Sequence, residues 1–358
     1  MNKPTCLIGA MSAALLLAAC GVTPQAVSSR LTGPCGPALR LAYPAWSPDG
    51  QHIAFESIHV ISPDSYWHEI ALMDKDGAGL VQLTQEPDYA EFPVWSRDGK
   101  RLAFIVYRGR DSQIVVVNSD GTGLTSLLSG HTTYADPAWS PDGKRLAFAQ
   151  SHDGNWDIHI MNDDGTGVIR LTDDAADETF FTWLPDGHRI AFVRHGQLYL
   201  MTPDGADVTL IGNARNVDDA PAWSPDGRRF VFASRPSAGD DTLFLMNTEA
   251  GDPAPLTGSA AYEFRPAWSP DANRVAFVSL RDGNYEIYVL DLNTGSQSRL
   301  TNNYYSDDFP VWSPDGKKIA FTTDRDGADE IYVMNADGTS PVRLTSNPGN
   351  QKCLRWPF

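Results

Sequence analysis

Acidic side chains recur at one place in this 358-residue sequence, three to five residues before a tryptophan that itself repeats. The series is Glu91, Asp136, Glu178, Asp218 with Asp219, Glu263, and Asp307 with Asp308. Carboxylates gathered at one place focus a negative potential and attract cations, such as a basic peptide segment, an inserted Lys or Arg side chain, or a divalent metal ion. The series therefore favours cation binding. The alternative is that these residues are acidic only because loops are polar.

Histidine and cysteine spacing does not indicate a second centre of chemistry. The eight histidines include no His-x-x-x-His pair and no Cys/His cluster of the zinc-binding kind. His59 and His68, with Tyr66 and Trp67 between them, are candidates for ligand contact, with a simple loop insertion as the alternative. The Asp-Gly turns lack the alternating spacing of a calcium loop, and a Gly-x-Ser-x-Gly hydrolase elbow is absent from the sequence. We therefore predict no catalytic residues and assign no metal ligands.

The tryptophans that follow the acidic residues belong to a repeat whose copies are 40 to 49 residues apart. Trp-Ser-Pro-Asp-Gly stands at 46–50, 139–143, 223–227 and 312–316, with near copies at Trp95, Trp183 and Trp268. Proline presets φ at the second position of a turn and glycine tolerates positive φ. The phrase therefore predicts a chain reversal between two strands, and we expect its tryptophan in the core between repeats.

Each repeat contains four segments that favour β-strands. An apolar strand such as Leu146–Phe148 follows the first turn, a third such as Glu330–Met334 follows a polar loop, and a fourth ends in Leu-Thr. Strands that are apolar on both faces belong to a sheet packed between two others. Four-stranded sheets repeated at this period are typical of a propeller. We predict an all-β fold: a single β-propeller over 41–346 with seven four-stranded blades, and six or eight blades as alternatives because the ends are ambiguous.

The first 19 residues have the pattern of an export signal, because the apolar run Leu7–Ala19 is too short to span a bilayer. Leu17-Ala18-Ala19-Cys20 resembles a bacterial lipobox, after which the cysteine carries lipid as the first mature residue. We therefore predict a lipoprotein signal peptide over 1–19, lipidation at Cys20 and a flexible tether over 20–40. An ordinary signal peptide is the alternative. The resemblance implies anchoring on the periplasmic side of the outer membrane.

Two further cysteines predict a disulfide, and the net charge indicates which partners are favoured. Cys35 lies just before the first blade and Cys353 lies in a C-terminal closing segment over 347–358, places that meet in a closed ring. Exported proteins retain disulfides, so we predict a Cys35–Cys353 disulfide. The formal net charge of −17 disfavours nucleic acid and favours a basic partner. Membrane contact is expected through the lipid anchor only.

The repeated pattern xPxWSPDGxxIAFxS…EIYVMxxDGxxxxRLT resembles the TolB-like propeller repeat, a relative of WD-repeat propellers. The resemblance covers nearly all of the predicted mature chain and implies a stand-alone lipoprotein member of that family. Such propellers dock proteins, gate peptidases, or carry a metal-dependent site as in oligogalacturonate lyases. We expect a non-enzymatic periplasmic module that binds an envelope protein or basic peptide at an acidic channel mouth. The alternative is a carbohydrate-active or metal-binding propeller enzyme. No cofactor is expected unless the carboxylates hold a divalent cation.

Overall fold

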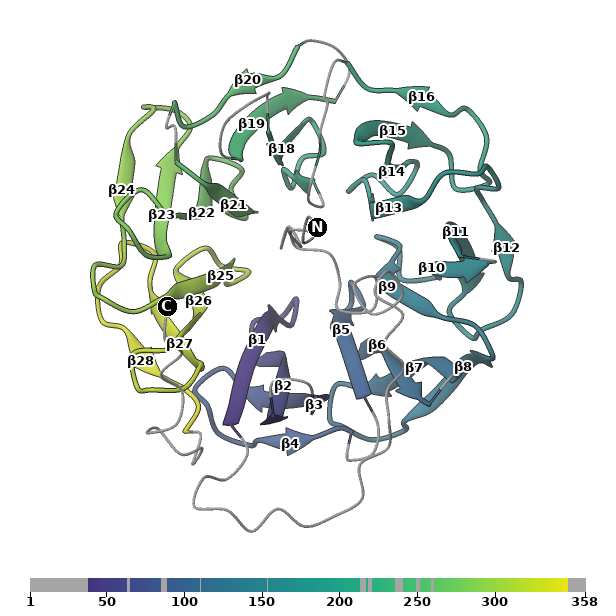
Figure 1. The fold of residues 1–358 in the computed structure, drawn as a ribbon, viewed down its shortest axis with the longest axis horizontal. Coiled ribbons are helices and arrows are strands. Elements are labelled where there is room, and N and C mark those ends of the chain that lie inside the picture. The colour runs from purple at the N-terminus through teal and green to yellow at the C-terminus, as the bar shows by residue number, and fades with distance from the viewer. Residues whose placement is uncertain are drawn as a thin grey trace, which may run out of the picture.

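The computed structural model describes residues 38–346, apart from gaps at 63–64, 85–88, 110, 153, 213–216, 218–220, 236–240, 249–251 and 259–260. The described chain is all-β and forms seven four-stranded antiparallel sheets. These sheets are arranged as blades around a central axis (Figure 1). The prediction of a seven-bladed propeller is confirmed. Within the described ranges, no helix has the length and apolar character needed to cross a membrane.

Each blade uses four consecutive strands, ordered from the axis outward as they follow in the chain. The innermost strands are β1 (Ala38–Trp46), β5 (Tyr89–Trp95), β9 (Tyr134–Trp139), β13 (Glu178–Trp183), β17 (Ala222–Trp223), β21 (Glu263–Trp268) and β25 (Asp307–Trp312). The second strands are β2 (His52–Ser62), β6 (Arg101–Arg108), β10 (Arg145–His152), β14 (Ile190–Arg194), β18 (Arg229–Ser234), β22 (Arg274–Ser279) and β26 (Lys318–Thr323).

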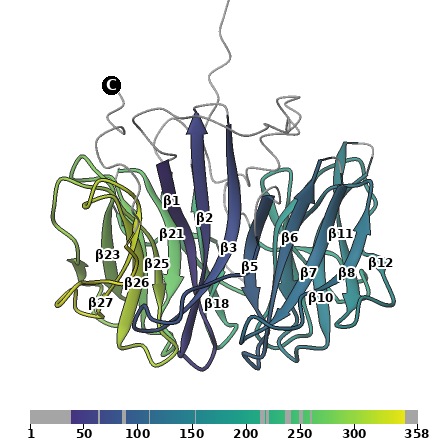
Figure 2. The ribbon, with the colours of Figure 1, turned by 90° about the horizontal axis from the view of Figure 1, so that it is seen from below.

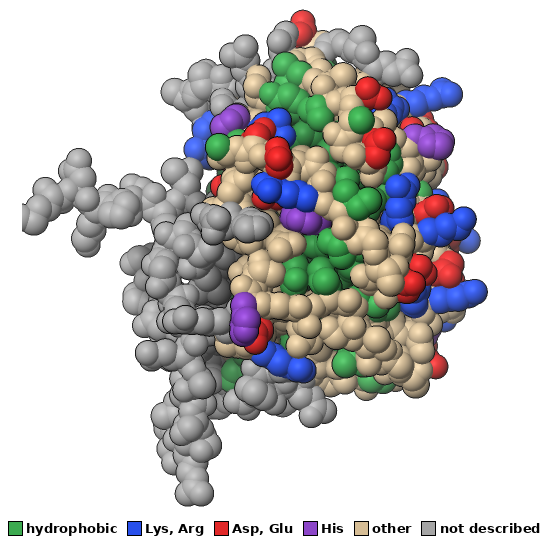
Figure 3. Space-filling model, turned by 90° about the vertical axis from the view of Figure 1, so that its right-hand side faces the viewer, with side chains coloured by type: hydrophobic (Ala, Val, Ile, Leu, Met, Phe, Trp, Pro, Cys, Tyr) green, Lys and Arg blue, Asp and Glu red, His purple; other side chains and the backbone are tan. Residues whose placement is uncertain are grey.

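The third strands are β3 (Ser65–Asp74), β7 (Asp111–Asn118), β11 (Asn155–Asn162), β15 (Gln197–Met201), β19 (Thr242–Asn247), β23 (Glu286–Asp291) and β27 (Glu330–Asn335). The outermost strands are β4 (Val81–Gln82), β8 (Thr125–Gly130), β12 (Ile169–Arg170), β16 (Thr209–Leu210), β20 (Ala254–Pro255), β24 (Gln297–Arg299) and β28 (Val342–Arg343). Most of these outer strands are only two residues long, which limits edge-to-edge pairing with other chains. On the side formed by blades 2 to 4, acidic and basic side chains are interspersed among apolar ones (Figure 3).

The Trp-Ser-Pro-Asp-Gly phrase forms the turn between the first and second strands. In blade 1, Ser47 Oγ donates a hydrogen bond to Asp49 Oδ1 at 2.6 Å, and the same carboxylate accepts from the N–H of Gln51 at 3.0 Å. Gly50 takes the positive φ of 69° that the turn requires. The Ser47 hydroxyl is the main reason that the pKa of Asp49 is lowered. These aspartates therefore close turns.

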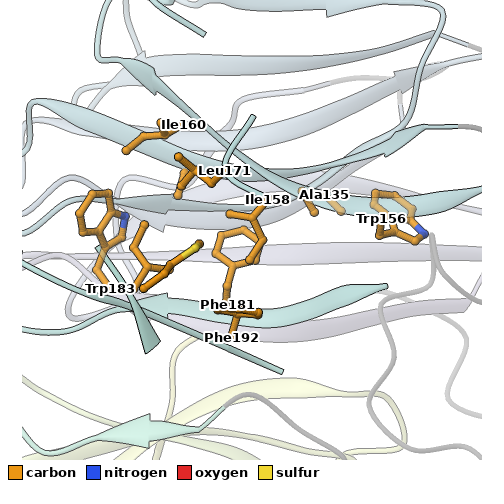
Figure 4. Packing of buried hydrophobic residues seen from close by; sticks show 12 residues of the cluster. Ala135, Trp156, Ile158, Ile160, Leu171, Phe181, Trp183 and Phe192 are labelled. Carbon is orange, nitrogen blue, oxygen red and sulfur yellow. The ribbon is translucent and has the colours of Figure 1, made fainter. Parts of the chain in front are cut away.

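An apolar core joins each pair of neighbouring blades. Between blades 3 and 4, Ile158 and Leu171 pack against Phe181, Trp183 and Phe192 (Figure 4). One such cluster lies at each of the seven joints. The prediction that the repeated tryptophans lie between blades is confirmed, since most of them are buried in these clusters.

The indole nitrogens of four repeated tryptophans form hydrogen bonds across the joints. Trp95, Trp183, Trp268 and Trp312 donate to the main-chain oxygens of Ala45, Ala138, Ala222 and Ala267 at 2.8–3.1 Å. Each acceptor is the residue before the tryptophan of the preceding blade. At the other three joints that residue is Val94, Thr182 or Val311, and the indole nitrogens of Trp139, Trp223 and Trp46 have no hydrogen-bond partner among the described residues.

In the part of the chain that the structure describes, the ring closes by packing between blades 7 and 1, and each of these blades takes its four strands from one continuous stretch. Leu41 and Phe55 of blade 1 share a core with Ile331 of blade 7. A Cβ added to Gly77 would lie 2.5 Å from the main-chain oxygen of Leu344 in blade 7. The same close approach recurs inside the ring, where a Cβ on Gly165 would lie 2.6 Å from the oxygen of Leu127. The closing joint therefore has the geometry of the others.

Blade 1 is longer than its neighbours, with β1, β2 and β3 spanning 9, 11 and 10 residues. Of these strands, β2 and β3 rise highest in the side view (Figure 2). Because β1 begins at Ala38, it includes the last residues of the segment predicted as a tether. Residues 1–37 and 347–358 lie outside the described part of the chain, and so do Cys20, Cys35 and Cys353. The signal peptide, lipidation and disulfide therefore stay predictions.

Candidate functional site

The predicted acidic residues occupy three different positions on the innermost strands. Glu178, Glu263 and Asp307 lie five residues before their tryptophans, Glu91 and Asp308 lie four before, and Asp136 lies three before. Successive side chains in a strand point to opposite faces, so these positions have different surroundings. Asp218 and Asp219 lie outside the described residues. The common function predicted for the series, cation binding, stays a prediction.

A β-bulge lies three residues before the tryptophan in every innermost strand except the short β17. The bulge residues have positive φ near 50–61° although none of them is glycine; they are Tyr43, Phe92, Asp136, Phe180, Arg265 and Phe309. This conformation is uncommon outside glycine, and bulges re-aim the side chains that they carry. On blades 6, 7 and 1 the re-aimed side chains meet: the Arg265 guanidinium lies 3.5 Å from the Phe309 ring centroid, and Tyr43 contacts the same ring at 4.5 Å.

On blades 4 and 7 the acidic residue five before the tryptophan forms an ion pair within its own blade. Arg194 Nε lies 2.7 Å from Glu178 Oε1, and Arg325 lies 2.8 Å from Asp307 Oδ1. Both carboxylates are fully buried, and both arginines are partly exposed. Arg194 ends the second strand of blade 4, and Arg325 lies in the loop after the second strand of blade 7. These pairs hold the innermost strand to the next part of the blade.

Blade 6 contains the corresponding pair between Glu263 and Arg281. At the position four before the tryptophan, Asp308 of blade 7 pairs with Arg265 of blade 6. The described carboxylates of the predicted series on blades 4, 6 and 7 are therefore each matched by an arginine.

Blades 1 and 2 bring two carboxylates together around a histidine. His68 Nδ1 on β3 lies 3.4 Å from Glu56 Oε2 on β2 and 3.2 Å from Glu91 Oε1 on β5. All three side chains are buried. Burial lowers the pKa of His68, but hydrogen bonds to Glu56 and Glu91 and their charges outweigh it and raise that pKa to about 9. Burial raises the pKa of Glu56.

Neighbouring groups fix this arrangement. The Tyr89 hydroxyl donates to Glu91 Oε1 at 3.0 Å and lies 3.3 Å from His68 Nε2, and its ring stacks on the imidazole at 4.4 Å. The N–H of Phe92 donates to Glu56 Oε1 at 2.8 Å. Because the bulge of β5 positions Phe92, the backbone of blade 2 orients a carboxylate of blade 1.

Asp136, the bulge residue of β9, extends the acidic region to blade 3. Burial and the charge of Glu91 raise the pKa of Asp136 to about 7. Burial, followed by the charges of Glu91, Asp136 and Glu56, also raises the pKa of Tyr107 well above its usual value. Carboxylates of blades 1, 2 and 3 therefore all contribute to the negative potential around Tyr107. We call Glu56, His68, Glu91 and Asp136 the blade 1–3 cluster.

Sequence reasoning included Glu91 and Asp136 and considered His68, but it missed Glu56. Its signal is readable: the apolar second strand of every other repeat continues after phenylalanine with Ile, Ala, Val or Thr, whereas Phe55 is followed by a glutamate. His59 is separate from the cluster. It stacks on Trp67 at 4.8 Å and lies 2.9 Å from Glu69 Oε2.

Comparison with individual known proteins gives matches that are either short or low in sequence identity. The chain is 34% identical to the Tol-Pal system protein TolB of Actinobacillus succinogenes over 58 residues, which are 16% of this chain and 14% of that relative. The chain therefore matches well under two thirds of that protein.

Two solved structures share the fold at low sequence identity. TolB from Acinetobacter baumannii superposes with a TM-score of 0.54 at 20% identity, over 84% of this chain and 82% of that one. An oligogalacturonate lyase from Vibrio parahaemolyticus superposes with a TM-score of 0.62 at 15% identity, over 85% of this chain and 92% of that one. At such identities the likeness concerns the fold alone.

The match to a protein family is much more extensive. The TolB β-propeller domain family matches residues 58–212 and 197–356, which together take in most of the sequence and nearly all of the propeller. The matched segments contain six of the seven repeated turns with their tryptophans, and all of the blade 1–3 cluster except Glu56. The chain therefore belongs to the TolB β-propeller domain family.

Proposed function

We propose that this protein is a cell-envelope module that binds a basic segment of another protein at the blade 1–3 cluster. Membership of the TolB propeller family supports a protein-binding role, because its relative in Actinobacillus succinogenes is a component of the Tol-Pal system. The net charge of −17 supports a basic partner, which a negative surface attracts and orients during encounter.

The observation that carries this proposal is the uneven neutralisation of carboxylates around the axis. Arginines pair with Glu178, Glu263 and Asp307 on blades 4, 6 and 7. On blades 1 and 2, one histidine lies between two carboxylates. Asp136 is a third carboxylate, and the charge of Glu91 contributes to its raised pKa. A lysine or arginine from a partner would supply the missing charge, and the partly exposed Asp136 is where it would arrive.

The cellular setting is part of the proposal. The lipobox-like Leu17–Cys20 and the TolB family favour a periplasmic protein held to the outer membrane by lipid at Cys20. Replacement of Cys20 by serine should release a folded protein from the membrane fraction, because the propeller does not need the anchor to fold. If Cys20→Ser still sediments fully with outer membranes, the lipid assignment is wrong.

Binding can be measured directly with a fluorescent peptide of alternating lysine and serine, using the full chain and fluorescence anisotropy. We expect the peptide to bind and its affinity to fall as salt rises, since exposed charges are screened. The double variant Glu91→Gln/Asp136→Asn should bind about tenfold more weakly, which corresponds to about 1.4 kcal/mol. Glu69→Gln is the matched control, because it removes a buried β3 carboxylate outside the cluster.

Several results would contradict the proposal. They are absence of peptide binding, binding that does not respond to salt, and equal weakening by the control. If the peptide binds as expected, chemical crosslinking in intact envelopes identifies the partner as a protein that is captured by the wild type and lost in the double variant. The alternative of a lyase-like enzyme rests on the shared fold, and turnover of oligogalacturonate by the purified chain would favour it.

A further inference from the structure

We propose that Glu56, His68 and Glu91 form a binding site for a transition-metal dication, with zinc as the best fit. The ligand atoms would be one carboxylate oxygen from each glutamate and Nδ1 of the histidine. They come from three strands and two blades, so the ion would connect blade 1 to blade 2. The three ligands belong to the blade 1–3 cluster, so a bound ion would share Glu91 with the partner site proposed above. Metal binding itself needs neither Asp136 nor a peptide, so the two proposals can be tested separately.

The spacing of the ligand atoms suits such an ion. Nδ1 of His68 lies 3.4 Å from Glu56 Oε2 and 3.2 Å from Glu91 Oε1, and one ligand atom from each residue lies within 4.8 Å of the others. Zinc bonds of about 2.0–2.1 Å in a tetrahedron separate neighbouring ligand atoms by roughly 3.3 Å. The two histidine–carboxylate distances therefore match two edges of a zinc tetrahedron. The third edge, between the two carboxylate oxygens, is at most 4.8 Å long, and it would shorten when an ion binds.

The ligand types distinguish zinc from other common cations. Imidazole with carboxylates is a usual donor set for zinc, whereas calcium and magnesium take oxygen ligands almost exclusively. Three protein ligands leave a fourth position for water or another group. We therefore expect zinc to bind more tightly than manganese, and calcium to bind weakly.

Two buried carboxylate oxygens are available to a cation. Glu91 Oε2 accepts no hydrogen bond from the described residues, and Glu56 Oε2 has the His68 imidazole as its neighbour at 3.4 Å. The side chains of both glutamates are only 1–2% exposed. Two carboxylates, a neutral histidine and a dication together form a neutral group. Such a group avoids the cost of an unbalanced buried charge.

The surroundings of the three ligands resemble the outer shell of a metal site. A histidine that binds metal through one nitrogen usually donates the other N–H to a fixed acceptor, which sets the tautomer and the ring orientation. Here the Tyr89 hydroxyl lies 3.3 Å from His68 Nε2, and it donates its own hydrogen bond to Glu91 Oε1. The N–H of Phe92 holds the other oxygen of Glu56 at 2.8 Å. The ligands are thus oriented before an ion arrives.

The test is metal analysis of the full chain, purified without chelator and with all four cysteines replaced by serine so that thiols do not bind zinc. After treatment with EDTA and dialysis, titration with zinc sulfate should show one ion bound per chain and a higher melting temperature. Cobalt(II) should bind at the same place and give visible bands without the thiolate charge-transfer absorption. His68→Gln and Glu91→Gln should each lower zinc affinity at least about tenfold, in line with the loss of a ligand.

Glu69→Gln is the control, because it changes the neighbouring residue on β3 and leaves the three ligands in place. It should bind zinc as the unsubstituted chain does. The proposal is overturned if zinc neither binds stoichiometrically nor raises the melting temperature, a measurement that needs no site variant. It is also overturned if His68→Gln and Glu91→Gln, shown by circular dichroism to be folded, bind zinc as tightly as the control.

Discussion

Asp136 is a member of the blade 1–3 cluster whose charge changes close to neutral pH. Its pKa, raised to about 7 by burial and by Glu91, lies above the ordinary value of 3.8. The folded state therefore holds this proton more tightly than the unfolded state, so ionisation of Asp136 destabilises the fold as pH rises from about 4 through about 7.

We predict from this shift that Asp136→Asn raises the melting temperature near pH 8, because the amide cannot ionise. The gain should shrink as pH falls and should vanish well below the ordinary pKa of 3.8, where the carboxyl is protonated in both states. Melting curves across this pH range check the prediction. A variant that is less stable than wild type near pH 8 would show that the Asp136 carboxylate has a stabilising partner.

The repeated tryptophans allow a matched comparison of one hydrogen bond. Trp183 and Trp139 are both buried, with an arginine over each ring, but only Trp183 has an acceptor for its indole N–H among the described residues. We predict that Trp183→Phe destabilises the protein by about 1 kcal/mol more than Trp139→Phe, the usual net value of a hydrogen bond. Urea unfolding of the two variants measures the difference. Equal losses would mean that the bond to Ala138 adds nothing.

Individual residue roles were only partly predictable from the sequence. Burial of the tryptophans follows from the apolar residues around them, which a single repeat already displays. The partners of their indole nitrogens depend on the residue that precedes tryptophan in another blade, which becomes meaningful once the blades are placed side by side. Glu56 was missed for a related reason: its role depends on Glu91, which is distant in sequence and adjacent in space.

At the scale of the strand, the buried ion pairs fasten the first strand of a blade to the end of its second. Glu263 at the start of β21 is fully buried and pairs with Arg281, which follows β22. Arg281 also lies over the ring of Tyr288 at 4.3 Å, so it covers the neighbouring strand as well. Such a pair fixes geometry even where its net contribution to stability is small.

We predict that Arg281→Met destabilises the protein by about 3 kcal/mol, because it leaves a buried carboxylate without its cation. The double variant Glu263→Leu/Arg281→Met should recover most of that loss, since it removes both charges. Denaturant titrations of the single and double variants measure the coupling. A double variant as unstable as the single one would show that the arginine acts through packing rather than through charge.

The strands themselves were predicted well because each carries its own evidence: a turn phrase, an apolar core and a Leu-Thr ending. The acidic series was harder to interpret because it mixes three positions. Glu178, Glu91 and Asp136 look equivalent within a window of three residues, but alternation along the strand gives them an arginine, a histidine and a bulge respectively. A bulge shifts this alternation by one residue. The local sequence does not mark the bulge, because the bulge residue is aromatic in some blades, acidic in another and basic in another.

At the scale of the whole molecule, the closing joint between blades 7 and 1 can be tested at Gly77. Its positive φ of 84° already disfavours a side chain, and a Cβ would approach the oxygen of Leu344 to 2.5 Å. Gly283 has a similar φ of 94°, but a Cβ there would meet nothing within 4 Å among the described residues. The pair separates backbone strain from contact between blades.

We predict that Gly283→Ala costs about 1–2 kcal/mol, as expected for the backbone conformation alone, and that Gly77→Ala costs clearly more. The extra loss should appear with faster proteolysis, because the close approach of blade 1 to blade 7 is disturbed. Thermal unfolding and limited proteolysis provide the two measurements. Equal effects at both glycines would show that the closing joint yields to a methyl group without loss.

The contiguity of each blade in the chain affects how such a ring can change over evolutionary time. Each blade in the described part of the chain is built from consecutive strands, so the packing between blades 7 and 1 is of the same kind as at the other joints, without a peptide link between the blades. A gene rearranged to start at β5 and finish at β4, with residues 346 and 38 linked, would encode the same joints. Duplication or loss of one segment of forty-odd residues would likewise add or remove a whole blade. The architecture thus leaves the starting point of the gene free to vary while the blade order and the packing between neighbours are kept.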